Sequence, residues 1–144
     1  MIILDTNVTS EIMRASPSPV VITWLRAQDP KELYSTAVTV AEIRYGIARL
    51  PNSARKKKLV EAAADVFAAF SDRVLAFDLA AADEYGDIVL TRERAGASIN
   101  GFDAQIASIC RAHDALLATR NVKDFANSGI NVANPWAEDL IDGR

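Results

Sequence analysis

The chain has 144 residues, which is enough for one domain with a core of its own. Half of the residues are hydrophobic and 24% are charged, as in an ordinary soluble protein, and no apolar stretch approaches the roughly 18–20 residues that cross a bilayer. The first residues have neither the basic region nor the cleavage site of a secretory signal, so we expect a cytoplasmic protein with no membrane partner.

The net charge of −3 argues against tight, non-specific binding along a nucleic-acid backbone. It does not exclude an RNA substrate. If four of the 19 acidic residues are held at one metal site, 15 remain against 16 basic residues, and the metal neutralises part of the acidic centre.

The single cysteine and the single histidine direct any chemistry toward carboxylates. Cys110 excludes an internal disulfide and a cysteine zinc site, and its apolar neighbours predict a buried thiol. His113 would be the only base for a serine or cysteine nucleophile, and no nucleophile elbow is present. We expect His113 to lie at a helix end on the surface.

The expected elements alternate between strands and helices along the chain. Apolar runs closed by polar residues predict strands, apolar residues at three-to-four spacing predict helices, and Pro51, Ser53 and Gly96 stand where helices would stop or start. In chain order we expect strand 2–4, helix 8–13, a break at 16–19, helix 20–27, strand 33–35, helix 38–50, a long helix to about residue 70, strand 74–77, helix 80–95, helix 102–112, strand 115–118, a turn at 122–125 and a fifth strand at 130–133.

This alternation predicts an α/β fold, with a parallel sheet covered by helices on both faces. There is no internal repeat and no linker, so we expect one domain over residues 1–144, with a short C-terminal tail from about residue 137.

Four acidic residues fall where ligands collect in such folds, at the carboxyl ends of the strands. Asp5 follows the first strand, Asp124 lies shortly after the fourth, and Asp103 opens the helix that leads into the fourth. Glu42 directly precedes the apolar residue Ile43, about 100° round the helix, which places it beside the buried stripe.

Carboxylates that meet at one place repel each other, and a hard divalent cation removes that penalty. Oxygen ligands suit Mg²⁺ or Mn²⁺, and one or two such ions support hydrolysis of a phosphodiester without help from a histidine. Nineteen acidic residues could form many apparent clusters, so this argument alone is not specific.

The segments around these acids make the prediction specific. In order and spacing they resemble the four signatures of PIN-domain nucleases, and the resemblance extends over nearly the whole chain. The matching segments are 4–7 with Ser10-Glu11, then 39–43 with 45–47, then 102–107 and 117–125, followed by the closing Asn134-Pro135-Trp136. Within this family the chain most resembles the toxin half of VapBC-type toxin–antitoxin pairs, close to the FitB-like branch.

The resemblance implies a Rossmann-like sheet of about five parallel strands and an endoribonuclease that depends on Mg²⁺ or Mn²⁺. It also implies a homodimer and a cognate antitoxin that binds operator DNA. Motif by motif it places the acidic quartet on Asp5, Glu42, Asp103 and Asp124, with Asp5 and Asp103 as direct metal ligands. The same matching makes Thr6, Asn7, Thr119 and Asn121 polar groups that support those ligands.

Three points stay open in the sequence. In this family the last acid varies in place, so Asn121 or Thr119 could replace Asp124. A phosphatase of the haloacid-dehalogenase type also has an aspartate after its first strand, although the second aspartate it needs is Asn7 here. A non-catalytic binding module that keeps the PIN scaffold is the third alternative.

Other charged and aromatic residues suggest weaker functions. Arg120 and Lys123 flank the fourth acid and are candidates for phosphate contacts. The basic run 55–58 is spread around a helix and cannot all face one substrate, so we expect a solvated helix end. We interpret Asp83, Glu84, Asp87, Arg92 and Arg94 as surface charge, and Trp24, Tyr45 and Trp136 as core or interface packing.

Overall fold

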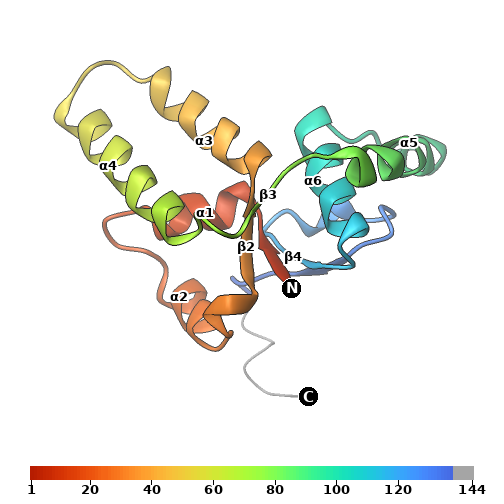
Figure 1. Ribbon diagram of the computed structural model, residues 1–144, viewed down its shortest axis with the longest axis horizontal. Coiled ribbons are helices and arrows are strands. Elements are labelled where there is room, and N and C mark those ends of the chain that lie inside the picture. The colour runs from red at the N-terminus through yellow and green to blue at the C-terminus, as the bar shows by residue number, and fades with distance from the viewer. Residues whose placement is uncertain (138–144) are drawn as a thin grey trace.

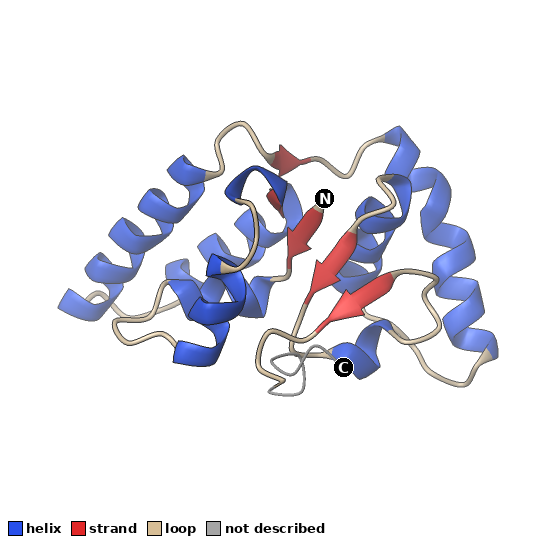
Figure 2. Cartoon of the chain, turned by 90° about the horizontal axis from the view of Figure 1, so that it is seen from below, coloured by secondary structure: helices blue, strands red, loops and turns tan. Residues whose placement is uncertain are grey.

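A computed structural model describes residues 1–137 of the chain. Within them five strands form one sheet in the order β3-β2-β1-β4-β5, and all four neighbouring pairs are parallel. Figure 2 shows the strands side by side in the middle of the molecule with helices around them. The strands are β1 (Ile2–Leu4), β2 (Leu33–Thr36), β3 (Val74–Leu75), β4 (Leu116–Ala118) and β5 (Asn131–Ala133). The predicted fold class is therefore confirmed.

Six α-helices and two 3-10 helices connect the strands of this described part. Figure 1 shows α3 and α4 on one side of the central strands and α5 and α6 on the other. The helices are α1 (Thr6–Ile12), α2 (Pro19–Arg26), α3 (Ala37–Ala48), α4 (Ala54–Ala69), α5 (Leu79–Arg94) and α6 (Gly101–Ala112), with the 3-10 helices η1 (Pro30–Glu32) and η2 (Val122–Phe125). None of the helices within residues 1–137 is both long and apolar enough to cross a bilayer.

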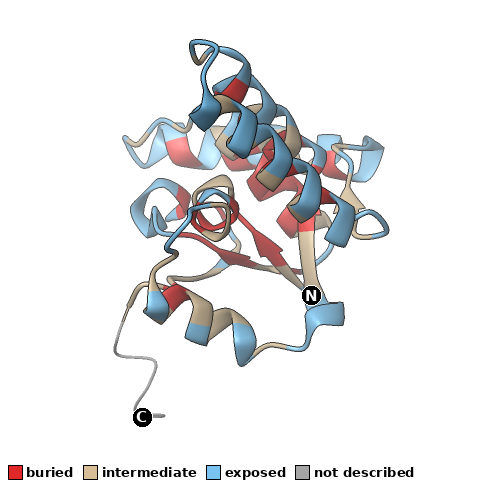
Figure 3. Cartoon of the chain, turned by 90° about the vertical axis from the view of Figure 1, so that its left-hand side faces the viewer, coloured by how far each residue is buried: buried red, intermediate tan, exposed pale blue. Residues whose placement is uncertain are grey.

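The central strands are buried on both faces, as Figure 3 shows. Successive side chains of a strand point to opposite faces, so Ile3 and Leu4 enter different clusters. Ile3 packs with Leu117 against α5 and α6, whereas Leu4 packs with Val8 of α1 and Val21 of α2. This two-sided burial explains why the strands read as continuous apolar runs.

The α3–α4 pair carries a small core of its own. Ile43 and Ile47 of α3 pack against Ala63 and Phe67 of α4, with Met13 at the edge of the cluster. The predicted stripe on α3 is thus confirmed at its centre. The pair projects from the sheet, and α3 begins directly after the carboxyl end of β2 (Figure 1).

Two predicted helix signals are confirmed and one helix begins earlier than predicted. The Ser53 hydroxyl accepts a hydrogen bond from the backbone N–H of Lys56 and caps α4, and Gly96, at φ +75°, follows the end of α5 in a conformation that favours glycine. The first helix was expected at 8–13 but starts at Thr6, because Asp5 itself is its cap.

The remaining differences are small. The predicted strand 74–77 has only two residues in the sheet, and Pro30–Glu32 forms a 3-10 turn that the sequence pattern did not indicate. The expected tail lies almost wholly outside the described residues. Cys110 is fully buried and His113 is an exposed helix-end residue, as predicted.

Candidate carboxylate site

Asp5 lies at the carboxyl end of the central strand, where β1 turns directly into α1. Its backbone N–H donates to the carbonyl of Ala118 at 2.9 Å, which ties it to the end of β4. Its Oδ1 accepts a hydrogen bond from the backbone N–H of Thr6 at 2.8 Å. The side chain is only 3% exposed, so a carboxylate stands almost without water at the start of a helix.

The end of β4 supplies polar partners for that carboxylate. The Thr119 hydroxyl donates to Asp5 Oδ2 at 2.7 Å, and the Asn7 amide reaches the same oxygen at 3.4 Å. Asn7 also accepts a hydrogen bond from the backbone N–H of Arg120, and Thr119 accepts one from the backbone N–H of Asn121. These four residues therefore hold Asp5 and the loop after β4 in one network.

Glu42 reaches the same place from α3. The Thr6 hydroxyl donates to Glu42 Oε1 at 3.1 Å, while the Thr6 backbone N–H serves Asp5. Thr6 thus joins two acids that are 37 positions apart in the sequence. The first turn of α3 is fixed by its cap, because the Thr36 hydroxyl accepts from the Thr39 N–H at 3.1 Å.

Asp103 stands in the first turn of α6, where the helix dipole favours a negative charge. Asn100 caps this helix by accepting from the Asp103 N–H at 2.8 Å. In return, its amide Nδ2 donates to Asp103 Oδ2 at 2.8 Å. This reciprocal pair resembles a capping box and fixes the carboxylate at the helix start.

Asp124 lies in η2 and is exposed to solvent. Its backbone N–H donates to the Asn121 carbonyl at 3.0 Å. Arg92 of α5 holds this turn in place. Its side chain is 4% exposed and donates to the carbonyls of Lys123 and Ala126 at 3.2 and 2.7 Å.

Arg92 also donates to the Ser98 carbonyl at 2.9 Å, in the stretch that leads to α6. One buried guanidinium therefore connects the Asp124 turn with the approach to Asp103. The interpretation of Arg92 as surface charge was wrong. Its spacing gave a signal that could have been read, since Arg92 lies four residues after the fully buried Ile88, on the same helix face.

The charges of the acids act on one another. Burial is the main cause that raises the pKa of Asp5, and the charge of Asp124 adds to it against the hydrogen bonds from Thr119 and Thr6. Burial also raises the pKa of Glu42, and the charges of Asp5 and Asp103 raise it further. Three of the predicted acids thus occupy one electrostatic neighbourhood, which Asp124 borders.

Asp103 shows the same effect most strongly. Burial first, and then the charge of Asp5, raise the pKa of Asp103 to about 6, although Asn100 and Arg92 oppose the shift. A site that makes its own carboxylates hard to ionise favours a cation among them, and an all-oxygen donor set fits Mg²⁺ or Mn²⁺.

The acidic side chains lie near one another but do not converge on one point. Among residues 1–137, no three histidine, cysteine, aspartate or glutamate side chains stand together as a ready set of metal ligands. Asp5, Glu42 and Asp103 each accept hydrogen bonds from a donor close by instead.

The remaining predicted residues are exposed or peripheral. Arg120 and Lys123 are exposed on the loop that carries Asp124, and the Arg120 guanidinium lies over the Trp136 ring, 4.8 Å from its centroid. Trp24 and Trp136 pack against the α1–α2 core, as expected. Tyr45 does not belong to the core, because it is 68% exposed. Glu84 and Asp87 do lie outside the core, and both pair with Arg111 of α6.

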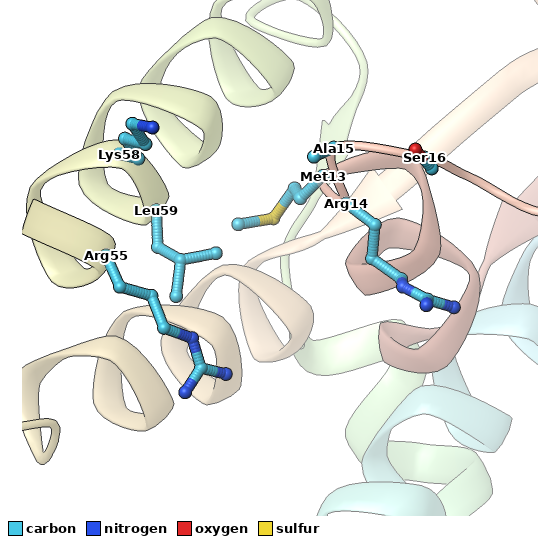
Figure 4. A pocket seen from close by; sticks show the side chains of 7 residues that line it. All are labelled: Met13, Arg14, Ala15, Ser16, Arg55, Lys58 and Leu59. Atoms are coloured by element: carbon cyan, nitrogen blue, oxygen red, sulfur yellow. The ribbon is translucent and has the colours of Figure 1, made fainter.

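A cavity lies away from the acids, between the end of α1 and the start of α4. It has a volume of about 760 Å³, and Met13 and Leu59 point toward each other across it (Figure 4). Arg14, Arg55 and Lys58 give it a basic rim. The side chains of the basic run 55–58 do not all face the cavity, as expected from their helical spacing. Lys56 instead donates to two carbonyls at the end of α3.

Comparison with known proteins identifies the class. The chain matches the PIN domain family over residues 2–129, and it belongs to that family. The predicted resemblance is confirmed, and the haloacid-dehalogenase alternative is wrong. Asn7, which replaces the second aspartate that such a phosphatase needs, instead binds Asp5.

Individual relatives agree with this assignment over almost their full length. The chain is 39% identical to VapC ribonuclease Y4jK of Sinorhizobium fredii, over 94% of this chain and 98% of the relative. It is 36% identical to toxin FitB of Neisseria gonorrhoeae, over 94% and 99%. The solved structure of FitAB bound to an IR36 DNA fragment superposes with a TM-score of 0.88 at 36% identity, over 95% and 96%.

Proposed function

We propose that the chain is a metal-dependent endoribonuclease and the toxin of a type II toxin–antitoxin pair. The observation that carries the proposal is that Asp5, Glu42 and Asp103 lie near one another at the carboxyl end of the sheet, where burial first, and then the charge of Asp5, raise the pKa of Glu42 and of Asp103. Relatives named as a VapC ribonuclease and as toxin FitB support the choice of RNA and of a toxin.

Asp5 and Asp103 are proposed to hold Mg²⁺ or Mn²⁺, with Glu42 and Asp124 completing the site. The bound ion would supply stabilisation of the charge that develops on the phosphate oxygens during hydrolysis. The donor set supports this assignment. The pKa values of Asp5 and Asp103 are raised, so ionised carboxylates are disfavoured here, and a bound hard cation would remove that penalty.

The neutral side chains orient the acids. Thr6 fixes the relative positions of Asp5 and Glu42, because it donates to both. Thr119 and Asn7 direct the second oxygen of Asp5, and Asn100 directs Asp103. Partners of this kind keep ligands in place, and losing one typically costs about 10–100-fold in metal affinity or activity.

Basic residues beside Asp124 are proposed to contact the RNA backbone. Arg120 and Lys123 are exposed and flank the acid on one loop. The Trp136 ring under Arg120 restricts its guanidinium, which reduces the entropy lost when a phosphate is bound. Asn121, whose backbone is held by Thr119, lies on the same loop.

The partner is proposed to be a cognate antitoxin, which would silence the enzyme and carry the complex to operator DNA. The solved FitAB complex, which superposes with a TM-score of 0.88, is bound to an IR36 DNA fragment. We propose that the toxin itself forms a homodimer. The basic-rimmed cavity between α1 and α4 offers a cationic surface away from the acids.

The decisive experiment uses the chain purified free of its partner. Single-stranded RNA should be cleaved with Mg²⁺ or Mn²⁺ and should stay intact with EDTA. Asp5→Asn should abolish cleavage while circular dichroism and the thermal midpoint stay close to those of the wild type. Cleavage that persists in EDTA or in Asp5→Asn would exclude the proposed mechanism.

A non-catalytic scaffold makes a different prediction. It binds no divalent ion, so calorimetric titration with Mn²⁺ would give no heat beyond dilution. Binding that Asp5→Asn and Asp103→Asn each weaken favours the enzyme.

A further inference from the structure

Two aromatic side chains stand exposed beside the acids. Tyr45 is 68% exposed on α3, and Phe102 is 53% exposed at the start of α6. Tyr45 lies one turn after Glu42 on α3, so the two share a helix face, and Phe102 directly precedes Asp103 in the sequence. The proposed catalysis uses neither ring.

The two rings line the same cavity. Ala41, Glu42, Tyr45 and Phe102 enclose a hollow of about 530 Å³ between α3 and α6, which we call the aromatic cleft. Its volume falls within the range of about 300–1,000 Å³ that is usual for small-molecule sites. Because Glu42 lines the cleft and belongs to the carboxylate site, the two are continuous.

Amide groups border the cleft on the α6 side. A second hollow of about 290 Å³ shares Glu42 and Phe102 with the first and adds Asn100, Gly101 and Gln105. The amide of Gln105 can both donate and accept hydrogen bonds, as the edges of nucleobases require. Asn100 is already used by Asp103, so Gln105 is the polar group available to a ligand.

A cation accompanies the first ring. The Arg49 guanidinium lies 5.8 Å from the centroid of the Tyr45 ring and takes up at most one of its two faces. Arg49 follows Tyr45 by one turn of α3, farther from Glu42. A base stacked on Tyr45 would therefore place its own phosphate near a positive charge, in a region where the carboxylates otherwise repel RNA.

We propose that the aromatic cleft binds an unpaired nucleobase of the RNA, stacked on Tyr45 and Phe102, and so sets which nucleotide lies beside the acids. This inference rests on the proposed function. Stacking on exposed aromatic rings is how single-stranded RNA is generally held, and it requires bases that are not paired. A second copy of the chain is the competing occupant of these rings.

The first test measures cleavage of a short single-stranded RNA by the full chain. Tyr45→Ala and Phe102→Ala should each raise KM by roughly tenfold, since stacking contributes about 1–3 kcal/mol per base, and should change kcat much less. Tyr45→Phe keeps the ring and should restore KM. Leu79→Ala removes an apolar side chain on α5 that is 77% exposed, and should leave KM unchanged.

The second test needs no cleavage. In the Asp5→Asn background, fluorescence anisotropy compares an intact RNA with RNAs that carry one abasic nucleotide at successive positions. One position should weaken binding by roughly tenfold, and adding Tyr45→Ala with Phe102→Ala should remove that sensitivity. Equal binding of all abasic RNAs would overturn the inference.

The outcomes separate this inference from the proposed function. If the wild type cuts no RNA, the proposed function fails. The anisotropy measurements with abasic RNAs then still show whether the aromatic cleft binds a base. If cleavage occurs and both alanine variants keep the wild-type KM, only the cleft is wrong. If sedimentation velocity shows that Tyr45→Ala converts a dimer into a monomer and the abasic RNAs bind alike, the rings belong to a contact between copies, which overturns the inference.

Discussion

The two ends of the proposed site are built differently. Asp5 is buried, follows the central strand and is held by neighbours on α1 and by Thr119. Asp124 is exposed in a 3-10 turn whose carbonyls are bound by Arg92, more than 30 positions away. The difference shows that one acid is placed by the strand that carries it, and the other by a distant side chain.

The largest effect is expected at the buried end. Asp5→Asn removes the charge at the centre of the cluster, and RNA cleavage should fall by about 10³-fold or more, because a metal site contributes several kcal/mol to the stabilisation of a transition state. Initial rates over a range of Mn²⁺ concentrations measure this. Recovery of the wild-type rate at high Mn²⁺ would show that Asp5 is not a ligand.

The stability of the same variant provides the control. Burial raises the pKa of Asp5. At pH values above the ordinary pKa of an aspartate, the ionised Asp5 side chain therefore lowers the stability of the folded protein. At neutral pH and without metal, Asp5→Asn should therefore unfold at the wild-type temperature or above it. A lower midpoint would mean that the loss of activity reflects a damaged fold.

Arg92 should produce the next largest effect, and it tests the comparison at its exposed end. Arg92→Met removes the side-chain donor from the carbonyls of Ser98 and Ala126, and leaves the Lys123 carbonyl with only the backbone N–H of Ala126. We expect a loss of about 1–3 kcal/mol in the free energy of unfolding and a fall in cleavage of about 10–100-fold. Denaturant unfolding and steady-state kinetics measure the two.

A matched variant separates positioning from stability. Arg94 lies on the same helix and is exposed, so Arg94→Met should change neither quantity by a measurable amount. If Arg92→Met were destabilised but kept the wild-type kcat and Mn²⁺ affinity, the arginine would support the fold without positioning the acids.

The same contrast explains what the sequence could and could not predict. The central strands, the helices and the sheet follow from apolar runs and helical spacing, because each strand is buried on both faces. Asp5 was predictable for the same reason, as the first polar residue after such a run. Glu42 was placed beside a buried stripe by its distance of one residue from Ile43, and this is where it lies.

Contacts made across the fold were not predictable in this way. Arg92 was interpreted as surface charge, since an arginine in a helix is usually solvated and its three carbonyl partners are not adjacent in sequence. Tyr45 was expected to pack, but its position on α3 turns it toward the aromatic cleft. The first helix began early because the cap was the same aspartate that the motif had assigned to the metal.

The pH dependence of Mn²⁺ affinity and of stability tests Asp103, which lies between the buried and the exposed acid in the comparison. Because the pKa of Asp103 is raised to about 6, Mn²⁺ affinity should be constant above that pH and should fall by up to about tenfold per unit below it. For the metal-free protein the sign is opposite. Its stability should rise as the pH falls from about 6 toward the ordinary value of 3.8, as the half-buried charge of Asp103 is neutralised.

Calorimetry and thermal melts in EDTA, each from pH 7.5 to 4.5, measure the two trends. Asp103→Asn removes the titrating group, so it should weaken binding at every pH and reduce the rise in thermal midpoint. Melts of the wild type and of Asp103→Asn with the same dependence on pH would show that Asp103 is not the group responsible.

The smallest effect is expected from Asp124→Asn. An exposed carboxylate acts through water, where its electrostatic contribution is several times weaker than that of a buried one, so cleavage should fall by less than about tenfold.

The two residues that could replace Asp124 differ in a way that can be tested. Thr119 is fully buried and already donates to Asp5, whereas Asn121 is exposed on the same loop as Asp124. Asp124→Asn combined with Asn121→Ala should therefore lose more than the product of the two single losses if Asn121 can replace Asp124 at the ion. A loss equal to that product would assign the two side chains to separate steps.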